Sequence, residues 1–252
     1  MPDLDWLTAR PIAHRGLHDV DVGIIENTLS AAEAAIAGTY GIELDVQPDA
    51  EDEPVVFHDS TLNRVTEGSG PVSALAAKDL AAIALKHTGD RIVTLSTFLE
   101  AVGGRVPVVV EIKGGWSNQT GFFAKTAAAL TACKGPVAVM SFDPTAVAFF
   151  RKHHPGIPRG ITAMRFGGQE ARRLSPLQRF VLSHMLHALN TRPHFIAYNT
   201  LDLPAFAPNL LRRASGLPVL TWTVRSEQER KRTAPWADQI IFEGFIPQGM
   251  GP

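Results

Sequence analysis

The sequence predicts an α/β protein, a (β/α)8 TIM barrel with a small insertion after the second barrel strand. Three observations predict this class. The length of 252 residues suits one such domain. Short apolar runs alternate with helix-like segments, and several runs are rich in Val and Ile throughout, as in parallel strands covered on both faces. We therefore expect a single domain over residues 1–252, with the insertion at about 59–106.

Nine segments have the length and composition of strands. Each is a short apolar run bounded by turn residues or by helix-prone sequence. In chain order they are Ile12–Arg15, Ile42–Val46, Val55–His58, Pro107–Lys113, Val137–Phe142, Arg159–Thr162, Phe195–Asn199, Val219–Val224 and Gln239–Glu243. Because a barrel of this class has eight strands, one of the nine must lie outside it.

The segment Val55–His58 is the one expected outside the barrel. Only residues 47–54 separate it from Ile42–Val46, too few for a parallel crossover that contains a helix. The acidic segment Asp49–Glu53 is better interpreted as the tip of a hairpin. The returning strand then brings His58 back toward Glu43 and its neighbours.

Two long excursions interrupt the regular alternation. The first, Asp59–Val106, is expected to contain its own helix around Ala74–Leu85. The second, Ala163–Pro193, contains an amphipathic stretch at Leu177–Leu189. Helical periodicity predicts that its apolar side chains face the barrel, with a hydrophobic lid or an oligomer contact as the alternative. These positions include Leu177, Val181, Met185 and Leu189.

Composition indicates a protein without a strongly charged partner. Lys and Arg number 24 against 25 Asp and Glu, so no global field favours nucleic acid or an anionic membrane. The single Cys133 excludes an internal disulfide and suits a reducing compartment. No run of about 18 apolar residues is present, and the acidic start Met1–Trp6 leads into no apolar signal region. We expect a soluble, cytoplasmic protein without stable membrane insertion and without nucleic acid as a partner.

Three carboxylates are expected to meet at the ends of neighbouring strands. Strand alternation places Glu43 and Asp45 on one side, and Glu111 lies near the end of the next barrel strand. Like charges facing an apolar interior are costly unless a cation joins them. A divalent cation with oxygen ligands explains all three, with Mg²⁺ or Ca²⁺ expected and Mn²⁺ possible. The alternative is structural ion pairing of Glu43 with Arg15 and of Glu111 with Lys113.

Two histidines lie near this acidic cluster at strand ends. His14 lies at the end of the first strand, and His58 ends the returning hairpin strand. Two imidazoles with pKa values near neutrality can share acid and base roles across a phosphorus centre. Arg15 offers a planar fork and Lys113 a compact charge for phosphate oxygens. His18 is close enough to His14 to be a lesser candidate for the site.

Eight short motifs in this order resemble the glycerophosphodiester phosphodiesterase family. Each is weak alone, whereas the ordered set, which spans residues 12 to about 243, is specific. The motifs are His14-Arg15-Gly16, Glu26-Asn27-Thr28, Glu43-Leu44-Asp45-Val46, Val56-Phe57-His58-Asp59, Thr61-Leu62-Asn63-Arg64, Glu111-Ile112-Lys113, Ser141-Phe142-Asp143 and Thr221-Trp222-Thr223-Val224.

The resemblance implies a phospholipase-C-like phosphodiesterase barrel that binds a divalent metal. It implies metal ligation by Glu43, Asp45 and Glu111, a catalytic pair in His14 and His58, and phosphate binding by Arg15, to which we add Lys113. Residues expected to support the site are Glu26, Asn27, Trp222 and Glu243. The end of the last strand departs from the family, which has Thr-Asp before a proline where this chain has Ile241-Phe242-Glu243-Gly244.

These features predict metal-dependent hydrolysis of a small glycerophosphodiester to glycerol phosphate and an alcohol, a reaction of lipid and glycerol metabolism. The nucleophile is either water or a glycerol hydroxyl that gives a cyclic phosphate. The sequence specifies neither the head-group alcohol nor the physiological metal nor the oligomeric state. The alternatives are a lysophospholipase D or inositol-phospholipid phosphodiesterase of the same barrel type, a carbohydrate hydrolase with paired acids, and a non-catalytic binding protein.

Overall fold

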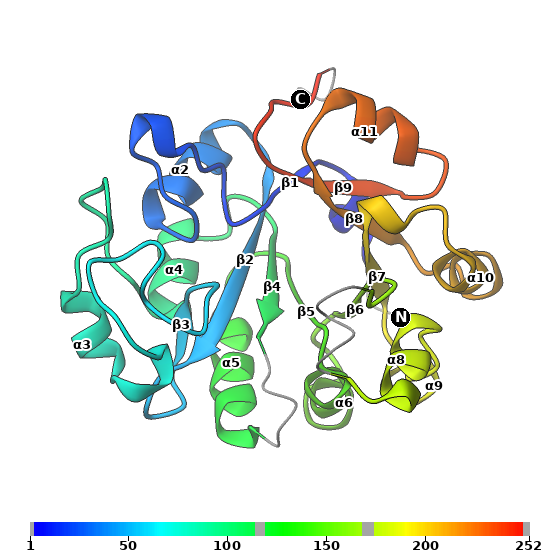
Figure 1. Cartoon of the computed structure of the whole chain (residues 1–252), viewed down its shortest axis with the longest axis horizontal. Helices are drawn as coiled ribbons and strands as arrows, with labels where there is room; N and C mark the ends of the chain where they lie inside the picture. The colour runs from blue at the N-terminus through cyan, green and yellow to red at the C-terminus, as the bar shows by residue number, and fades with distance from the viewer. Residues whose placement is uncertain (1–2, 114–118, 168–173, 249–252) are drawn as a thin grey trace.

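Eight parallel strands close into a barrel surrounded by helices in the computed structural model, which describes residues 3–113, 119–167 and 174–248 (Figure 1). The strands follow one another around the barrel in chain order, and β1 closes it by pairing with both β2 and β9. The predicted TIM barrel is confirmed. The barrel strands are β1 Ile12–Ala13, β2 Gly41–Pro48, β4 Val108–Ile112, β5 Val137–Ser141, β6 Arg159–Ala163, β7 Phe195–Asn199, β8 Val219–Val224 and β9 Gln239–Phe242.

The remaining strand, β3 (Pro54–Val56), lies outside the barrel as the loop length predicted. It pairs antiparallel with β2, with Gln47 opposite Val55. Asp49 forms the hairpin tip, because its Oδ1 accepts hydrogen bonds from the backbone N–H groups of Glu51 at 2.7 Å and Glu53 at 2.8 Å. The hairpin returns the chain to the end of β2 that carries the acidic residues.

Helices cover the outside of the barrel, and several begin at side-chain caps. Thr28, Thr94, Asp143, Ser175 and Ser226 each accept a hydrogen bond from a backbone N–H in the first turn that follows. The helices are α1 Asp5–Thr8, α2 Leu29–Ala37, α3 Ala77–Ala82, α4 Leu95–Val102, α5 Thr120–Ala132, α6 Pro144–His153, α8 Pro176–Ser183, α9 Ala188–Thr191, α10 Phe206–Ser215 and α11 Glu227–Thr233, with 3₁₀ turns at Val20–Val22, Val72–Ala74 and Thr200–Asp202.

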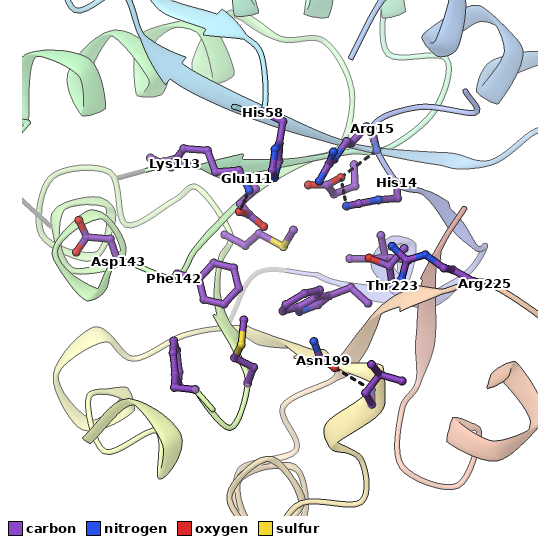
Figure 2. A pocket seen from close by; sticks show the side chains of 18 of the residues that line it. His14, Arg15, His58, Glu111, Lys113, Phe142, Asp143, Asn199, Thr223 and Arg225 are labelled. Atoms are coloured by element: carbon purple, nitrogen blue, oxygen red, sulfur yellow. Dashed lines mark hydrogen bonds and ion pairs between the residues drawn. The ribbon is translucent and has the colours of Figure 1, made fainter. Parts of the chain in front are cut away.

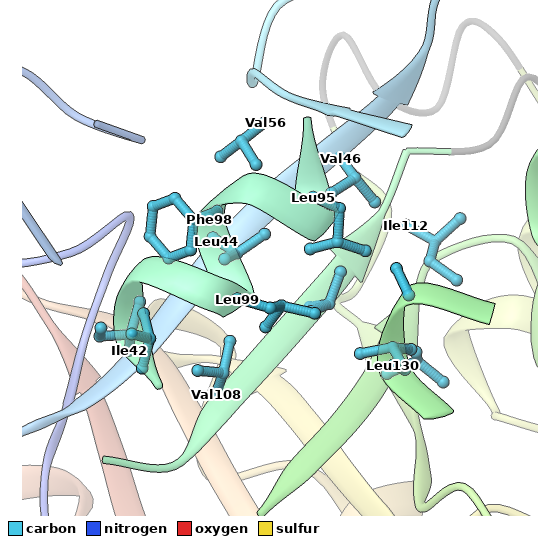
Figure 3. Close-up of a cluster of buried hydrophobic side chains, with 14 of the residues drawn as sticks. Ile42, Leu44, Val46, Val56, Leu95, Phe98, Leu99, Val108, Ile112 and Leu130 are labelled. Atoms are coloured by element: carbon cyan, nitrogen blue, oxygen red, sulfur yellow. The ribbon is translucent and has the colours of Figure 1, made fainter. Parts of the chain in front are cut away.

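The excursion between β3 and β4 divides into two parts. Its first part has a small core of its own, made by Val55, Phe57, Leu62, Val72, Leu80, Leu85 and Ile92. The helix expected around Ala74–Leu85 is present there as the shorter α3. Its second part, α4, packs on the barrel: Phe98 and Leu99 lie in one buried cluster with Ile42 and Leu44 of β2 (Figure 3). The helix α4 is therefore the crossover helix from β2 to β4.

Strand alternation fills the barrel interior with apolar side chains and places a second set of side chains at the carboxyl ends of the strands. Ile12, Val109, Met140, Leu220 and Ile241 form one buried apolar cluster together with Leu7 of α1. Two residues further along their strands, the same face presents His14, Glu111, Phe142, Trp222 and Glu243. These five residues lie at the carboxyl ends of the strands, where barrel enzymes place their chemistry.

The orientation expected for Leu177–Leu189 is wrong for its two ends. The side chain of Leu177 is 72% exposed and that of Leu189 is 84% exposed, whereas Met185 is buried and Val181 is half-buried. The stretch is not one helix but two, α8 and α9, and Met185 between them has a φ of 54°. Because this left-handed residue ends the helical repeat, a single 3.6-residue period does not describe the segment.

Within the three described ranges, no helix is both long enough and apolar enough to cross a lipid bilayer.

Thr28 is expected to stabilise the loop that holds the first strand's end. Its hydroxyl is buried, donates to the carbonyl of Ile25 at 2.7 Å and accepts from the N–H of Ala31 at 3.2 Å. Thr28→Ala leaves both groups unpaired, so we expect the free energy of unfolding in urea to fall by about 1–2 kcal/mol. Thr28→Ser keeps the hydroxyl and is the matched control. Equal stability of the Ala and Ser variants would contradict this account.

Candidate active site

A pocket of about 530 Å³ opens at the carboxyl ends of the barrel strands. Its size is within the range of small-molecule sites. Figure 2 shows His14, Arg15, His58, Glu111 and Lys113 on one side of it, facing Phe142 and Asn199 on the other. The pocket therefore has a charged half, formed from β1, β2 and β4, and a less polar half.

The three predicted metal carboxylates meet beneath the charged half. One ligand oxygen from each of Glu43, Asp45 and Glu111 lies within 4.8 Å of the others, and all three residues are buried. Strand register explains the approach, because Asp45 and Glu111 are paired across β2 and β4, and Glu43 is two residues before Asp45. Of all His, Cys, Asp and Glu groups in the described ranges, this is the cluster with metal-site geometry.

Burial and mutual repulsion make this cluster favourable for a cation. Burial, Asp45 and Glu111 together raise the pKa of Glu43 well above its usual value. The buried Oε1 of Glu43 has no hydrogen-bond partner within the described part of the chain. Burial also acts to raise the pKa of Asp45, but Lys113 and other nearby cationic groups hold it well below its usual range. An unpaired buried oxygen among three carboxylates fits a divalent ion with oxygen ligands.

Lys113 and Arg15 contact the carboxylates directly. The Nζ of Lys113 lies 2.8 Å from Asp45 Oδ1 and also contacts Glu111, while Arg15 Nε lies 3.2 Å from Asp45 Oδ2. The alternative of structural ion pairs is thus half correct. The Lys113–Glu111 pair forms, but Arg15 reaches Glu43 through its backbone N–H, at 3.0 Å from Oε2, and not through its guanidinium.

Glu26 and Asn27 support the site from behind Arg15. Glu26 Oε1 accepts from Arg15 at 2.7 Å. The amide of Asn27 brackets Asp45, donating to its Oδ2 at 3.0 Å and accepting from its backbone N–H at 3.1 Å. Arg15 and Asn27 both have left-handed backbones, with φ of 57° and 59°, so the loop after β1 is shaped around these contacts.

Each of the two predicted catalytic histidines is bound to a carboxylate through Nδ1. His14 Nδ1 lies 2.5 Å from Glu243 Oε2, and His58 Nδ1 lies 2.7 Å from Asp59 Oδ1. Both imidazoles line the pocket, and Nε2 of His14 lies 3.9 Å from Glu43 Oε2. Burial lowers the pKa of His14, and the neighbouring Arg15 adds to that effect, although Glu243 acts to raise it.

Glu243, whose role the sequence left open, thus lies beside His14 because β9 is the neighbour of β1. Its other oxygen, Oε1, lies 2.5 Å from Arg225, and His18 Nε2 is 3.7 Å from Oε2. Burial acts to raise the pKa of Glu243, but the hydrogen bond with His14, the nearby His18 and the charge of Arg225 hold it well below its usual range. Glu243 is therefore an anion fixed between His14 and Arg225.

Sequence reasoning did not assign three polar residues that the structure brings into these contacts. Asp59 binds His58, Arg64 bridges Asp59 and Glu26, and Arg225 binds Glu243. Asp59 and Arg64 stand in the recognised motifs, next to or near His58, so a signal for them was present. Arg225 stands just after a motif and had no comparable signal.

Sequence reasoning also missed the residues of the less polar half of the pocket, with the exception of Trp222. Trp222 lies in this half and not beside the carboxylates. Phe142 stacks edge-on against Trp222, with ring centroids 5.4 Å apart, and against Phe166 at 6.1 Å. We call the apolar side chains that line this half the apolar wall. They are Met140, Phe142, Met164, Phe166, Leu201 and Trp222.

Comparison with known proteins gives a consistent family. The model of the glycerophosphoryl diester phosphodiesterase family matches residues 14–246. One relative is the Bacillus subtilis protein YhdW, to which glycerophosphodiester phosphodiesterase activity is ascribed. It is 27% identical to this chain, and the alignment covers 92% of this chain and 93% of YhdW. Human glycerophosphodiester phosphodiesterase 1 is 26% identical over 87% of this chain and 72% of its own.

Solved structures share the barrel. A phosphodiesterase of Oleispira antarctica, in complex with the product sn-glycerol-3-phosphate, has a TM-score of 0.73 at 21% identity, with 92% of this chain and 91% of that chain covered. At 21% identity, the similarity to this solved structure establishes the fold alone. The family assignment rests on the sequence match to the family model. With a family model matched over nearly the whole chain, this protein belongs to the glycerophosphoryl diester phosphodiesterase family and is a phosphodiesterase enzyme.

Proposed function

We propose that the protein hydrolyses a glycerophosphodiester to glycerol phosphate and an alcohol in a metal-dependent reaction, with His14 and His58 as the general acid–base pair. The observation that carries the proposal is the pairing of each imidazole with a carboxylate at the rim of one pocket. A carboxylate at Nδ1 fixes the orientation and the tautomer of the ring, so that Nε2 is the atom that gains or loses a proton.

The residues that would hold the metal are Glu43, Asp45 and Glu111. When bound, a divalent ion supplies positive charge that stabilises negative charge on phosphate oxygens. Mg²⁺ and Ca²⁺ suit three buried carboxylates, and Mn²⁺ is also compatible. Lys113 already neutralises part of the cluster through Asp45 and Glu111, so its ammonium is held at the border between the carboxylates and the pocket.

Arg15 and Lys113 are the cationic groups proposed to bind the phosphate. Both line the pocket and both are anchored by Asp45, so their positions are set before a substrate arrives. A guanidinium can donate two parallel hydrogen bonds to phosphate oxygens, whereas an ammonium acts as a compact charge. Such preorganised charge favours the transition state, in which negative charge on these oxygens grows.

The two histidines complete the proposed reaction by moving protons. One Nε2 takes a proton from the attacking hydroxyl, and the other Nε2 donates a proton to the oxygen of the departing alcohol. Glu243 and Asp59 stabilise the imidazolium that each ring becomes when protonated. Attack by water and attack by a glycerol hydroxyl, through a cyclic phosphate, use the same groups.

A panel of glycerophosphodiesters tests the proposal. The protein is assayed with glycerophosphocholine, glycerophosphoethanolamine and glycerophosphoglycerol, each with Mg²⁺, Ca²⁺ or Mn²⁺, and released glycerol phosphate is measured. We expect at least one pair of diester and metal to be turned over and EDTA to stop the reaction. If no pair releases glycerol phosphate, the proposed function is wrong.

Glu243 is proposed as a positioning residue for His14. Glu243→Gln keeps the shape but removes the charge that orients the ring and stabilises its protonated form, so we expect kcat to fall at least about tenfold with little change in KM. Glu243→Asp keeps the charge and should recover part of kcat. Glu100→Gln, at an exposed position of α4, is the control. A Gln variant with wild-type kcat would show that the contact has no catalytic role.

A further inference from the structure

The exposed apolar side chains of this protein gather on one sector of its surface. Among the described residues, all the large exposed ones except Val20, Val22 and Ile246 lie between positions 177 and 210. They are Leu177, Phe180, Leu186, Leu189, Leu201, Phe206 and Leu210. This stretch forms the connections from β6 to β7 and from β7 to β8, which are neighbours because the strands are. Helices α8, α9 and α10 therefore lie beside one another on the outside of the barrel (Figure 1).

Helices α8 and α10 turn their large apolar side chains outward. Leu177 and Phe180 are three positions apart on α8, and Phe206 and Leu210 are four positions apart on α10, so each pair shares one face of its helix. All four side chains are exposed, and each helix buries a single other residue. By contrast, α4 and α5 bury their large apolar side chains against the barrel. The two helices thus present apolar faces that the barrel does not use.

The same sector is basic, although the chain as a whole is nearly neutral. Lys and Arg number 24 against 25 Asp and Glu in the full sequence. In the described residues between 163 and 215, however, the acidic side chain is that of Asp202 alone, and there are five arginines. They are Arg165, Arg179, Arg192, Arg212 and Arg213. The positive excess is therefore local to these connections.

Three of these arginines are not neutralised by the protein. Arg212 is paired with Asp238, and Arg165 lies 3.9 Å from Asp202. Arg179, Arg192 and Arg213 form no ion pair with any residue in the described part of the chain. Arg179 precedes Phe180 on α8, and Arg213 is seven positions after Phe206, on the same face of α10. Unpaired positive charge therefore accompanies both apolar faces.

An anionic lipid surface satisfies both features of this sector. Lipid phosphates attract the arginines, and the boundary between head groups and acyl chains accepts single protruding Leu and Phe side chains. A second copy of the chain would bury the apolar side chains but place like charges near one another. A nucleic acid would attract the arginines but would leave the leucines exposed to phosphate or water. The lipid surface is the occupant that uses the charge and the apolar groups together.

We propose that the outer surface of α8 and α10 docks the protein on a bilayer that contains anionic lipid. We call this surface the docking face, made by Leu177, Arg179, Phe180, Phe206, Leu210 and Arg213. Docking is peripheral, with these side chains in the head-group region. Leu201 lies in the same sector and lines the pocket, so docking brings the barrel mouth beside the bilayer. The proposal is independent of the reaction in the pocket and is tested without substrate.

Sedimentation with vesicles measures docking directly. The full chain is mixed with sucrose-loaded vesicles of phosphatidylcholine alone or of phosphatidylcholine with phosphatidylglycerol. We expect at least about tenfold tighter binding to the mixed vesicles, because each arginine near an anionic surface contributes roughly fivefold. Raising the salt from about 0.05 M to about 0.5 M should remove most of this difference, since added ions screen the charges. No binding to the mixed vesicles, or equal binding to both kinds, would overturn the proposal.

Substitution of apolar side chains locates the contact. Leu177 and Phe206 are 72% and 78% exposed, so Leu177→Asn/Phe206→Asn keeps the fold, which thermal unfolding checks. We expect this variant to bind the mixed vesicles at least about tenfold more weakly, because two large side chains no longer enter the bilayer. The matched control is Val20→Asn/Val22→Asn, in the loop after β1, across the barrel from β6. An equal loss in the control would show that the docking face is not the contact.

Substitution of the arginines tests the charge separately. Arg179→Gln/Arg213→Gln should lose most of the preference for the mixed vesicles while binding to phosphatidylcholine changes little. The control is Lys78→Gln/Arg91→Gln, two exposed cationic positions in the excursion after β3. If the control loses as much of the preference, the attraction is not specific to the docking face and the proposal is wrong.

The oligomeric state gives a further independent test. Light scattering after size-exclusion chromatography compares wild type with Leu177→Asn/Phe206→Asn. We expect the same mass for both, because the docking face is not covered by a second copy. A wild-type dimer that the variant dissociates would overturn the proposal and identify this surface as an interface between copies of the chain.

Discussion

Replacing His14 or His58 with alanine is expected to lower kcat for a glycerophosphodiester by roughly 10²- to 10⁴-fold. Each ring lines the pocket and is held by a carboxylate at Nδ1, so alanine removes a positioned proton carrier. The double variant should be much less impaired than the product of the two single effects, because the two residues act in one step. Steady-state kcat values of the single and double variants, determined at saturating metal, test these expectations.

The control for these variants is His153→Ala, since His153 is exposed on α6 and remote from the pocket lining. It should keep wild-type turnover. Thermal unfolding of all variants separates loss of chemistry from loss of fold. If both His14→Ala and His58→Ala retain near-wild-type kcat, the acid–base assignment is wrong.

Removal of the metal is the second change with a large expected effect. Treatment with EDTA should abolish turnover, and a divalent ion added back should restore it. Glu43→Gln should weaken binding of Mn²⁺, measured by titration calorimetry, because it neutralises a carboxylate proposed as a ligand. A metal at about one hundred times its Kd also adds about 2.7 kcal/mol to the free energy of unfolding, so the melting temperature reports binding without any assay of activity.

Glu43→Gln has a second signature that a merely destabilising change would not give. Burial, Asp45 and Glu111 raise the pKa of Glu43, which means that its charge is unfavourable in the metal-free fold. The neutral variant should therefore be at least as stable as metal-free wild type, yet it should gain little stability when Mn²⁺ is added. Glu100→Gln should behave as wild type. A Gln variant stabilised by Mn²⁺ as much as wild type would exclude Glu43 as a ligand.

The barrel and its outlying hairpin could be predicted because both follow from short-range rules. The Val- and Ile-rich runs identified the strands, and a connection too short for a crossover placed β3 outside the barrel. The first strand is shorter than predicted, Ile12–Ala13 instead of Ile12–Arg15, because Arg15 and Gly16 take left-handed backbones. That turn is determined by the contacts of the site rather than by the strand pattern.

The charged half of the site could be predicted because parallel strands end at one edge of the barrel. Strand alternation paired Glu43 with Asp45, and strand order brought Glu111 beside them. By contrast, the contact between His14 and Glu243 joins residues 229 positions apart and depends on how the barrel closes. A sequence pattern does not show which carboxylate will face which imidazole across that closure.

The apolar wall could not be predicted because its members look like core residues. Phe142 and Trp222 stood in recognised motifs, but Met164, Phe166 and Leu201 have no polar signal that separates a pocket from a packed interior. The same limit explains the error at Leu177 and Leu189, where apolar residues taken as core are exposed.

The central claim is tested most directly by following one glycerophosphodiester with ³¹P nuclear magnetic resonance, using metal-saturated wild type beside the His14→Ala/His58→Ala double variant. We predict that wild type replaces the diester resonance with that of glycerol phosphate, while the double variant leaves the diester intact over the same time. Formation of glycerol phosphate by the double variant at the wild-type rate, or its absence with wild type, would contradict the account.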